Sequence, residues 1–535
     1  MSKSRKILGA ILKYSLYTLF GIFFTFSVTA TALLIWYDNT FDIEFKTLLY
    51  VLSSPLKGTG AETISEILWV CIPSVLLAAA LYVLALISLN VLFSRRRPRL
   101  CVWLKRIGAA LCALSLILTA AFAVDTLRIM HYLELKNAQT TFYEEYYIKP
   151  IDELILNDGQ TKNLIYIYLE SMEVTYTSTE EGGKQTENYM PLLSDKAREN
   201  ISFSNLTDGK LGGFLNPEGT GWTVGALLGT SSGIPFSFPL GENGQNAMSK
   251  EKYFASGLIT LGDILEDEGY RQMFLCGSDI KFGGRDKYYK QHGNYEIYDL
   301  STAKINGDIP YDYHNGFWGF EDYILFDIAK DQLTELSSGD QPFNLTMLTV
   351  DAHHNGGFKC KYCKTDYTYL TEKNSHTASV ITCIDKQVSE FLDWCSEQDW
   401  YEDTAIVITG DHPRMDVRLV SKVPASERTI YNCFINSAVE PNYESDYSVE
   451  GRVWTAFDMF PTTLAAMGFE IIGDRLGLGT NMFSGLPTLA EELGYDVLNT
   501  EIQKYSSYYI GQFCPELAHR VEETEAPVTE KKKEE

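Results

Sequence analysis

Cysteine is scarce in this sequence of 535 residues, which contains ten. Only Cys360 and Cys363 are closely spaced, in a single Cys-x-x-Cys pattern, whereas a zinc ribbon needs two such pairs. Cys71, Cys101 and Cys112 fall in or beside apolar runs, where each is most simply a small hydrophobe. The chain is therefore neither a disulfide scaffold nor a zinc ribbon. For the close pair we predict a local disulfide or two free thiols rather than a metal knuckle.

Basic residues are also few relative to acidic ones. Lys and Arg number 45 against 70 Asp and Glu, and after residue 140 the imbalance is about 31 against 63. Nucleic-acid binding relies on basic patches, so we predict no nucleic-acid partner. The acidity suits solubility in a salty exterior. The Glu-rich tail, 521–535, is predicted to be disordered.

Charge is absent altogether from three N-terminal runs, 14–37, 67–93 and 107–124. Each run is long enough to cross a hydrocarbon core of about 30 Å. We predict a transmembrane anchor over residues 1–130, with helices at about 14–37, 67–93 and 107–126. The connection between the second and third runs is rich in Arg. By the positive-inside rule it faces the cytoplasm together with the N-terminus, so everything after about residue 130 lies outside.

Short β-rich runs alternate with amphipathic runs beyond a polar segment, 131–160, which we interpret as a helical linker. The predicted strands are 163–169, 272–276, 343–350 and 404–409, and the predicted helices are about 223–230, 258–268, 371–398 and 457–467. This alternation predicts an α/β domain with a mostly parallel central sheet and helices on both faces. We place that domain at 161–490 and a C-terminal segment at 491–535.

Acidic residues follow four of the predicted strands: Glu170, Asp279, Asp351 and Asp411, the last with His412 beside it. In such sheets the chemistry gathers at the carboxyl ends of the strands. One acid there is more often a helix cap or a loop residue, but four in succession predict a site. Carboxylates with an imidazole suit a divalent ion such as Mn²⁺, Mg²⁺ or Zn²⁺, and a cation lowers the pKa of a neighbouring hydroxyl.

A threonine opens an apolar run of small residues, 224–229, that is typical of a buried helix. Thr223 ends the segment Asn-Pro-Glu-Gly-Thr-Gly-Trp-Thr. A hydroxyl at such a position can be a nucleophile, although Thr223 could also cap the helix, and Thr220 offers the same group. A strand-end carboxylate, this threonine and the Asp-His pair together predict a one-metal phosphoryl-transfer site.

Six segments of the chain, taken in order over about 160–485, resemble the lipoteichoic acid synthase and phosphoglycerol transferase family, whose domain is alkaline-phosphatase/sulfatase-like. They are Glu170 in Tyr-Leu-Glu-Ser-Met, Thr223 in Gly-Thr-Gly-Trp-Thr, Arg285 in Phe-Gly-Gly-Arg-Asp, His353 in Asp-Ala-His-His, Asp411-His412 in Thr-Gly-Asp-His-Pro, and Asp458 in Asp-Met-Phe-Pro-Thr-Thr. The segments 219–223 and 475–479 are more similar to the membrane-anchored glucan phosphoglycerol transferases than to the polymerising synthases.

The resemblance implies roles for eight residues. Thr223 would be the nucleophile, and Mn²⁺, or alternatively Mg²⁺ or Zn²⁺, would be held by Glu170, Thr223, Asp411 and His412. Phosphoglycerol would be bound by Arg285 and His353, with Asp286 and Trp222 beside them. Arg285 next to Asp286 could instead form a surface ion pair. The synthases have a Trp two residues before that Arg, and this chain has Gly283, so the headgroup pocket differs in shape.

The function implied is a membrane-anchored phosphoglycerol transferase in a multi-pass bacterial cell-membrane protein with an extracytoplasmic catalytic domain. Phosphatidylglycerol would be the donor, and a glycan, glycolipid or polyglycerolphosphate chain the acceptor. A sulfatase would need Cys/Ser-x-Pro-x-Arg, which the nucleophile segment lacks. The alternatives are a phosphoethanolamine transferase, which also uses a threonine and a metal, a sulfatase-like hydrolase of the same fold, and a non-catalytic lipid- or glycan-binding sensor.

Overall fold

The computed structural model describes residues 3–41, 61–151, 154–157, 159–238, 251–421 and 423–517, with Ile43, Phe45, Lys46, Leu48, Leu49 and Met248. The tail predicted to be disordered, 521–535, lies outside the described residues. The chain divides into two compact units, one of residues 1–45 and 59–133, the other of residues 46–58 and 134–535. Each is described by itself.

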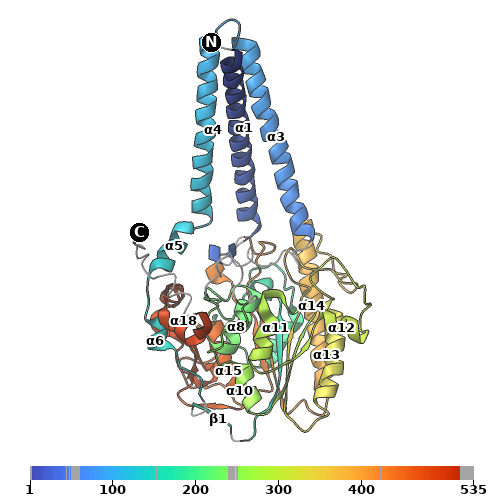
Figure 1. Ribbon diagram of the computed structural model, residues 1–535. Coiled ribbons are helices and arrows are strands. Elements are labelled where there is room, and N and C mark those ends of the chain that lie inside the picture. Colours follow the sequence, from blue (N-terminus) through green and yellow to red (C-terminus); the bar gives the residue numbers. More distant parts are fainter. Residues whose placement is uncertain are drawn as a thin grey trace, which may run out of the picture. The chain divides into compact units, whose positions relative to one another are not determined.

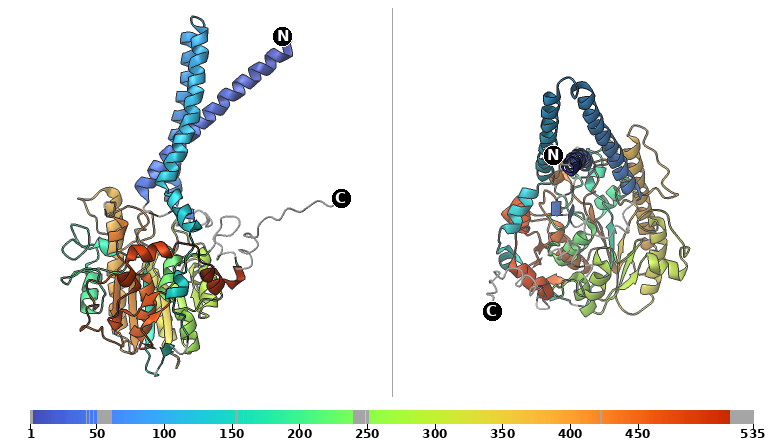
Figure 2. Two further views of the ribbon diagram at one scale, coloured as in Figure 1. Left: turned by 90° about the vertical axis from the view of Figure 1, so that its left-hand side faces the viewer. Right: turned by 45° about the horizontal axis from the view of Figure 1, so that its top comes forward.

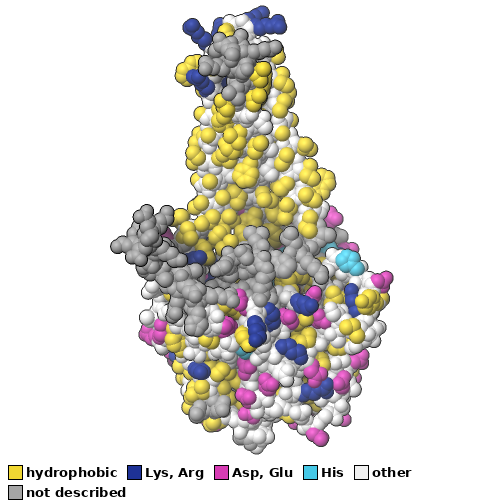
Figure 3. All heavy atoms as spheres, in the orientation of Figure 1, with side chains coloured by type: hydrophobic (Ala, Val, Ile, Leu, Met, Phe, Trp, Pro, Cys, Tyr) yellow, Lys and Arg dark blue, Asp and Glu magenta, His cyan; other side chains and the backbone are white. Residues whose placement is uncertain are grey.

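The first unit is built from three long helices, α1 (Lys3–Thr40), α3 (Ala61–Phe93) and α4 (Pro98–Thr126) (Figures 1 and 2). The stretches Ile11–Thr40, Ile64–Phe93 and Pro98–Thr126 are long and apolar enough to cross a membrane. Apolar side chains cover these helices, while Lys and Arg side chains gather at the end where α3 meets α4 (Figure 3). The three predicted apolar helices are confirmed.

Polar contacts join the helices of this unit. The Tyr82 hydroxyl on α3 donates to the Tyr17 carbonyl on α1 at 2.7 Å. Thr31 on α1 and Thr119 on α4 share a hydrogen bond of 3.0 Å. Without a hydrophobic driving force between helices in lipid, such bonds and close packing hold transmembrane helices together.

The second unit contains a six-stranded sheet of order β4-β3-β5-β2-β6-β7. Its strands are β2 (Asn163–Leu169), β3 (Arg271–Cys276), β4 (Glu296–Tyr298), β5 (Phe343–Leu348), β6 (Thr404–Gly410) and β7 (Asn432–Ile435). All neighbours are parallel except β6 and β7, which are antiparallel. The predicted mostly parallel sheet is confirmed, and its antiparallel edge strand was not predicted. The remaining strands form two small antiparallel pairs, β1 (Ile155–Leu156) with β8 (Glu470–Ile471) and β9 (Arg475–Leu476) with β10 (Gly479–Thr480).

Helices cover both faces of this sheet, as Figure 1 shows. Alternate residues of β2, Ile165 and Ile167, join a buried core with α7 (Pro191–Glu199), α13 (Asp322–Leu336) and α14 (Glu372–Ser396). On the other face, Tyr168 bonds to Thr230 of α8 (Thr223–Ser232) at 2.8 Å. The shorter helices are α5 (Ile129–Asn137), α6 (Phe142–Tyr146), α10 (Leu261–Asp267), α11 (Arg285–Gln291), α12 (Leu300–Asn306), α15 (Met459–Met467), α16 (Leu489–Leu493), α17 (Tyr495–Glu501) and α18 (Ser507–Phe513).

Candidate active site

Two neighbouring strands of the sheet deliver the predicted carboxylates to one place. Glu170 directly follows β2, and Asp411 and His412 directly follow β6. The register pairs Leu169 with Gly410, so Glu170 and Asp411 leave the sheet side by side. Their side chains and that of His412 are buried.

The three side chains converge closely. One ligand atom from each lies within 4.8 Å of the other two. His412 Nε2 is 3.4 Å from Asp411 Oδ2 and 3.7 Å from Glu170 Oε1. Two carboxylates and an imidazole within this radius form a donor set that suits a divalent cation.

Thr223 completes the arrangement. It is the first residue of α8, after Trp222 in the N-cap position, and its side chain is half-buried. Its Oγ1 lies 3.4 Å from Glu170 Oε2 and 3.4 Å from His412 Nε2. The N-terminal end of a helix favours anions, because its backbone N–H groups and dipole are positive there. A phosphoryl group beside Thr223 would meet that positive end.

Hydrogen bonds orient the ligand atoms of this cluster, and Glu170 Oε1 accepts one from Ser171 Oγ at 2.7 Å. Asp411 Oδ1 accepts from the backbone N–H of Ser171 at 2.7 Å and of His412 at 2.8 Å. Asp411 Oδ2 is buried and has no hydrogen-bond partner in the part of the chain that the structure describes. His412 Nδ1–H donates to the Pro413 carbonyl at 2.8 Å, which in the neutral ring leaves the Nε2 lone pair unprotonated. The residues therefore fit a metal ion.

The pKa shifts of these side chains also favour a bound cation. Burial and the charge of Asp411 raise the pKa of Glu170 to about 7. Burial also raises the pKa of Asp411. Burial by itself would lower the pKa of His412, but the carboxylates of Asp411 and Glu170 outweigh it and raise that pKa. A bound cation would relieve this crowding of buried negative charge.

Thr220, the alternative candidate for the nucleophile, has a hydroxyl that is bonded within its own loop. Its side chain is fully buried, and its Oγ1 donates to the Pro217 carbonyl at 2.6 Å. The amide of Asn216 donates to the Thr220 carbonyl at 2.8 Å and to the Asp411 carbonyl at 3.1 Å. This loop therefore ties the start of α8 to the end of β6, and Thr220 belongs to its scaffold.

Arg285 is a buried residue at the start of α11. Its Nη2 donates to Ser278 Oγ at 2.9 Å and to the Asp279 carbonyl at 2.8 Å, so it braces the loop that follows β3. Asp286 is half-buried, and its N–H donates to the Ile280 carbonyl at 3.1 Å. Within the described residues the two side chains form no ion pair with one another. Gly283 has a left-handed φ of 68° that a Trp would adopt only with strain.

His353 lies in a turn beyond β5, which ends at Leu348 rather than at the predicted residue 350. His354 follows it in the same turn. Their rings stack with centroids 4.2 Å apart. His353 Nδ1–H donates to the His354 carbonyl at 2.8 Å, and burial lowers the pKa of His353 well below its usual value. The ring is thus neutral, with its Nε2 lone pair as an acceptor.

Trp318 was not predicted from the sequence, because nothing in its local pattern separates it from a packing aromatic. The centroid of its ring lies 4.0 Å from the ring centroid of His353 and 4.9 Å from that of Phe282. Phe282 is in the loop before Arg285. The Nε1 of Trp318 is buried and has no hydrogen-bond partner in the described chain. Trp318 thus joins the two segments that carry the predicted substrate residues. Trp222, in contrast, is buried against Phe236, with ring centroids 5.6 Å apart.

Two of the four predicted strand-end acids stand outside the cluster. Asp279 accepts from the backbone N–H of Lys281 at 3.0 Å. Asp351 is buried, and burial raises its pKa well above the usual value. Only Glu170 and Asp411 are brought together with His412.

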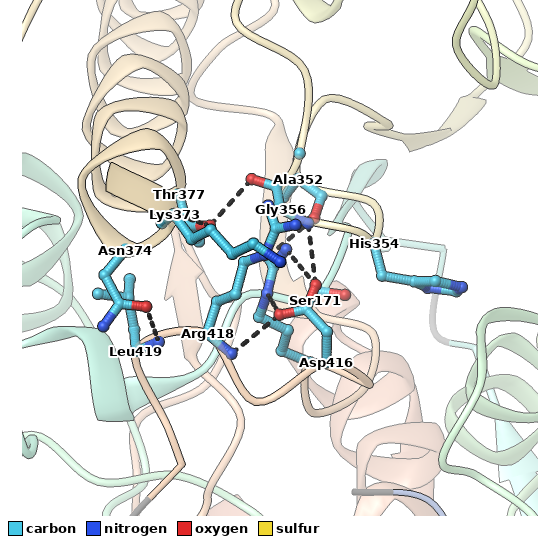
Figure 4. Close-up of polar contacts among 12 residues, drawn as sticks. Ser171, Ala352, His354, Gly356, Lys373, Asn374, Thr377, Asp416, Arg418 and Leu419 are labelled. Atoms are coloured by element: carbon cyan, nitrogen blue, oxygen red, sulfur yellow. Dashed lines mark hydrogen bonds and ion pairs between the residues drawn. The ribbon is translucent and has the colours of Figure 1, made fainter. Parts of the chain in front are cut away.

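A buried ion pair supports the loop that carries His353. Arg414 and Asp416 form two hydrogen bonds of 2.8 Å. Asp416 also accepts from the Gly356 N–H at 2.9 Å, and Thr377 of α14 donates to the Gly356 carbonyl at 3.1 Å (Figure 4). The backbone at Gly356 is therefore held from two sides.

Residues 162–416 match the Sulfatase family model. The matched region is α/β with a mostly parallel sheet, and it follows three apolar helices. It is 28% identical over 443 residues to phosphoglycerol transferase I of Escherichia fergusonii, across 82% of this chain and 53% of that protein. The predicted relationship to such transferases is confirmed, and the chain spans about half the length of this curated relative.

Solved structures to which the chain is similar include the lipoteichoic acid synthase LtaP from Listeria monocytogenes, with a TM-score of 0.46, 19% identity and coverage of 66% of this chain and 81% of that one. The integral membrane lipooligosaccharide phosphoethanolamine transferase A of Neisseria meningitidis has a TM-score of 0.45 and 13% identity, over 85% of this chain and 84% of that one.

Proposed function

We propose that this chain is a metal-dependent phosphoglycerol transferase that acts at the membrane, with phosphatidylglycerol as donor and a glycan, glycolipid or polyglycerolphosphate chain as acceptor. One observation carries the proposal: the half-buried hydroxyl of Thr223 lies 3.4 Å from both Glu170 and His412. The name of the curated relative supports phosphoglycerol as the transferred group. The three apolar helices would hold the site near a lipid donor and raise the donor's effective concentration.

Glu170, Asp411, His412 and Thr223 would hold the metal, for which Mn²⁺ is our first candidate, ahead of Mg²⁺ and Zn²⁺. When bound, a divalent cation lowers the pKa of a coordinated hydroxyl and neutralises phosphoryl charge. The Thr223 hydroxyl already points its donor towards Glu170 Oε2. Contacts with Glu170 and His412 thus orient Oγ1 for attack.

In the first step, Thr223 Oγ1 forms a bond to phosphorus as its proton leaves. The bond from phosphorus to the diacylglycerol oxygen breaks, and that oxygen takes up a proton. Glycerol phosphate remains on Thr223 as a phosphodiester. The N-terminus of α8 would stabilise the charge on the phosphoryl oxygens.

In the second step, an acceptor hydroxyl oxygen forms a bond to the same phosphorus, the bond from phosphorus to Thr223 Oγ1 breaks, and Oγ1 takes up a proton. His353 is our candidate for the base that takes the acceptor proton, because its neutral ring presents an unprotonated Nε2. Arg285 would orient the headgroup by bracing the loop after β3, and Asp286 lies beside it. The Trp318 Nε1–H is a further donor available to the glycerol hydroxyls. We assign Trp222 to packing behind the nucleophile.

The test is mass spectrometry of the full chain in detergent, incubated with phosphatidylglycerol and Mn²⁺ without an acceptor. We expect a glycerophosphate adduct on the peptide that contains Thr223, its loss in Thr223→Ala and its retention in Thr220→Ala. An adduct that survives in Thr223→Ala would overturn the assignment of the nucleophile. A phosphoethanolamine adduct from phosphatidylethanolamine, with none from phosphatidylglycerol, would support the related transferase. Lipid binding without any adduct would support a sensor.

We also propose that the domain after the anchor is extracytoplasmic in a bacterial cell membrane. The support is the run Arg95, Arg96 and Arg97 between α3 and α4, which the positive-inside rule places in the cytoplasm. A reporter fused to the C-terminus that is active only outside the cytoplasm would test this.

A further inference from the structure

Three cysteines from two segments meet in the second unit. Cys360 and Cys363 lie in the loop between β5 and α14, and Cys383 lies within α14. Cys360 Sγ is 3.6 Å from Cys363 Sγ and 3.8 Å from Cys383 Sγ. All three sulfurs lie within 4.8 Å of one another. The three cysteines are called the sulfur cluster below.

The spacing of the sulfur cluster matches that of a metal site. A disulfide needs sulfurs about 2.05 Å apart. Thiolates bound to zinc lie about 2.3 Å from the ion, and the edge of a tetrahedron with that bond length is about 3.8 Å. The two measured distances agree with this edge.

Backbone geometry shapes the loop around the first sulfur. The Tyr362 N–H points to Cys360 Sγ at 3.5 Å, and the Cys363 N–H donates to the Cys360 carbonyl at 3.1 Å, so the loop turns tightly around this sulfur. A backbone N–H that points to a sulfur is the kind of outer contact that supports a metal-bound thiolate.

Gln387, one turn after Cys383 on α14, gives a second and independent indication. Its side chain is 8% exposed, and its Nε2 lies 3.1 Å from Cys383 Sγ and 3.7 Å from Cys360 Sγ. Its Oε1 is buried and has no hydrogen-bond partner among the residues described. A buried amide that donates to two sulfurs is the outer support that metal-bound thiolates commonly receive.

We propose that Cys360, Cys363 and Cys383 bind a thiophilic divalent cation of the zinc class. No fourth His, Cys, Asp or Glu ligand joins the group within the described chain, so the fourth position is left to water or an exogenous ligand. Cys363 is the half-buried member and gives that position its access. Such an ion would fasten the loop that carries His353 to α14. The proposal does not depend on the transferase activity.

The charges around the cluster also favour a cation. Asp351 is 1% exposed, and neither of its carboxylate oxygens has a partner in the described residues. Asp322 accepts from the N–H groups of Val350 and Asp351 at 2.7 and 3.1 Å. Burial raises the pKa of both carboxyls, the charge of Asp322 adds to this at Asp351, and the charge of Cys360 contributes less to each. A dication at the sulfurs would favour the ionised forms of these two carboxyls.

The experiment uses the full chain in detergent, reduced and stripped of metal, and titrated with Co²⁺. We expect a thiolate-to-cobalt charge-transfer absorption that saturates at one equivalent and disappears when Zn²⁺ is added. Cys383→Ser should lose the absorption. Cys395→Ser, a matched control with a buried cysteine on the same helix outside the cluster, should keep it. Asp411→Asn should also keep it, which separates this site from the candidate active site. Gln387→Leu should weaken binding roughly tenfold.

Several outcomes would overturn the proposal. These are no charge-transfer absorption in the wild-type chain, equal loss in Cys395→Ser, or a disulfide linking two cluster members in unreduced, freshly purified protein. If Cys383→Ser fails to fold, alkylation of Cys363 in the wild-type chain replaces it. Zn²⁺ should protect Cys363 from alkylation, and equal labelling with and without Zn²⁺ would contradict the site.

Discussion

Two groups of three side chains that could hold a metal ion occur in the described part of this chain, and they are built in different ways. Glu170, Asp411 and His412 offer oxygen and nitrogen at the ends of two paired strands. The sulfur cluster offers softer donors from a loop and a helix. Hard cations prefer the first set and thiophilic cations the second. One fold can therefore keep two metals apart by donor chemistry as well as by place.

The two groups of side chains are also held in place by different kinds of contact. The segment after His412 is fixed by buried ion pairs, since Arg428 binds Glu173 at 2.7 Å and also donates to the Arg414 carbonyl at 2.6 Å. Among the residues that the structure describes, the sulfur cluster receives an amide and a backbone N–H but no such pair. Buried ion pairs thus support the strand-end site, whereas we expect the cluster to gain order from its ion.

The largest expected effect is on the transfer rate, which should fall much further when the strand-end site is changed than when the sulfur cluster is changed. Asp411→Asn should reduce phosphoglycerol transfer by roughly 1000-fold, because a lost metal ligand removes several kcal/mol of transition-state stabilisation at about 1.4 kcal/mol per tenfold. Cys383→Ser should cost only about tenfold, since it touches no reacting group. Rates with a fluorescent phosphatidylglycerol measure both. Equal losses would mean that the two groups serve the same chemistry.

Removing the ion pair behind the strand-end site should cost stability. Glu173→Gln leaves Arg428 buried without its counter-charge, and we expect the free energy of unfolding to fall by about 3 kcal/mol. The matched control is Glu427→Gln, which breaks the exposed pair with Lys184 and should cost less than about 1 kcal/mol. Denaturant unfolding of both variants compares them. Similar costs would show that burial does not distinguish the two pairs.

Acid should weaken metal binding at the strand-end site. The pKa of Glu170 is raised to about 7, so the metal-free fold holds more protons than the unfolded chain between about pH 4.5 and 7, and it loses stability as the pH rises through that window. A cation competes with those protons. In Cys383→Ser, which isolates this site, Mn²⁺ should therefore raise Tm more at pH 8 than at pH 6. A gain independent of pH would argue against Glu170 as a ligand.

The smallest effect concerns the helix that carries Cys383. Thr371 caps α14 by accepting from the Asn374 N–H at 3.4 Å. Thr371→Ala should lower the free energy of unfolding by about 1 kcal/mol. Because the cap lies three turns before Cys383, Co²⁺ affinity at the cluster should change little. A large change would show that α14 frays as far as the sulfurs.

Helices and strands with a regular pattern of apolar residues could be predicted from the sequence alone. The apolar runs, the strands at 163–169 and 404–410 and the helix starting at Thr223 follow from periodicity and composition. The strand-end acids were visible as candidates, but the sequence could not say that Glu170 and Asp411 would meet while Asp279 and Asp351 would not. Strand order accounts for Asp279, because β5 lies between β2 and β3. It does not account for Asp351, because β5 pairs with β2, but β5 ends at Leu348 and Asp351 lies in the turn three residues beyond it.

Contacts between distant segments account for what could not be predicted. Cys383 lies 20 residues after Cys363 with no motif, and only the packing of α14 brings it to the Cys-x-x-Cys loop. In the sequence nothing distinguishes Trp318 from the other aromatic residues. In the structure its ring contacts both His353 and Phe282. The edge strand β7 is short and antiparallel, so it lacks the helix-separated pattern of its neighbours.

The pairing of Leu169 with Gly410 has a mechanical consequence. Because Glu170 and Asp411 each extend a strand by one residue, the sheet's hydrogen-bond ladder sets the gap between them, and no flexible loop intervenes. A Cβ at Gly410 would come within 1.9 Å of the Met172 carbonyl oxygen. Even Gly410→Ala would wedge β6 away from the turn after β2, and the two carboxylates would lose their common centre without either being altered.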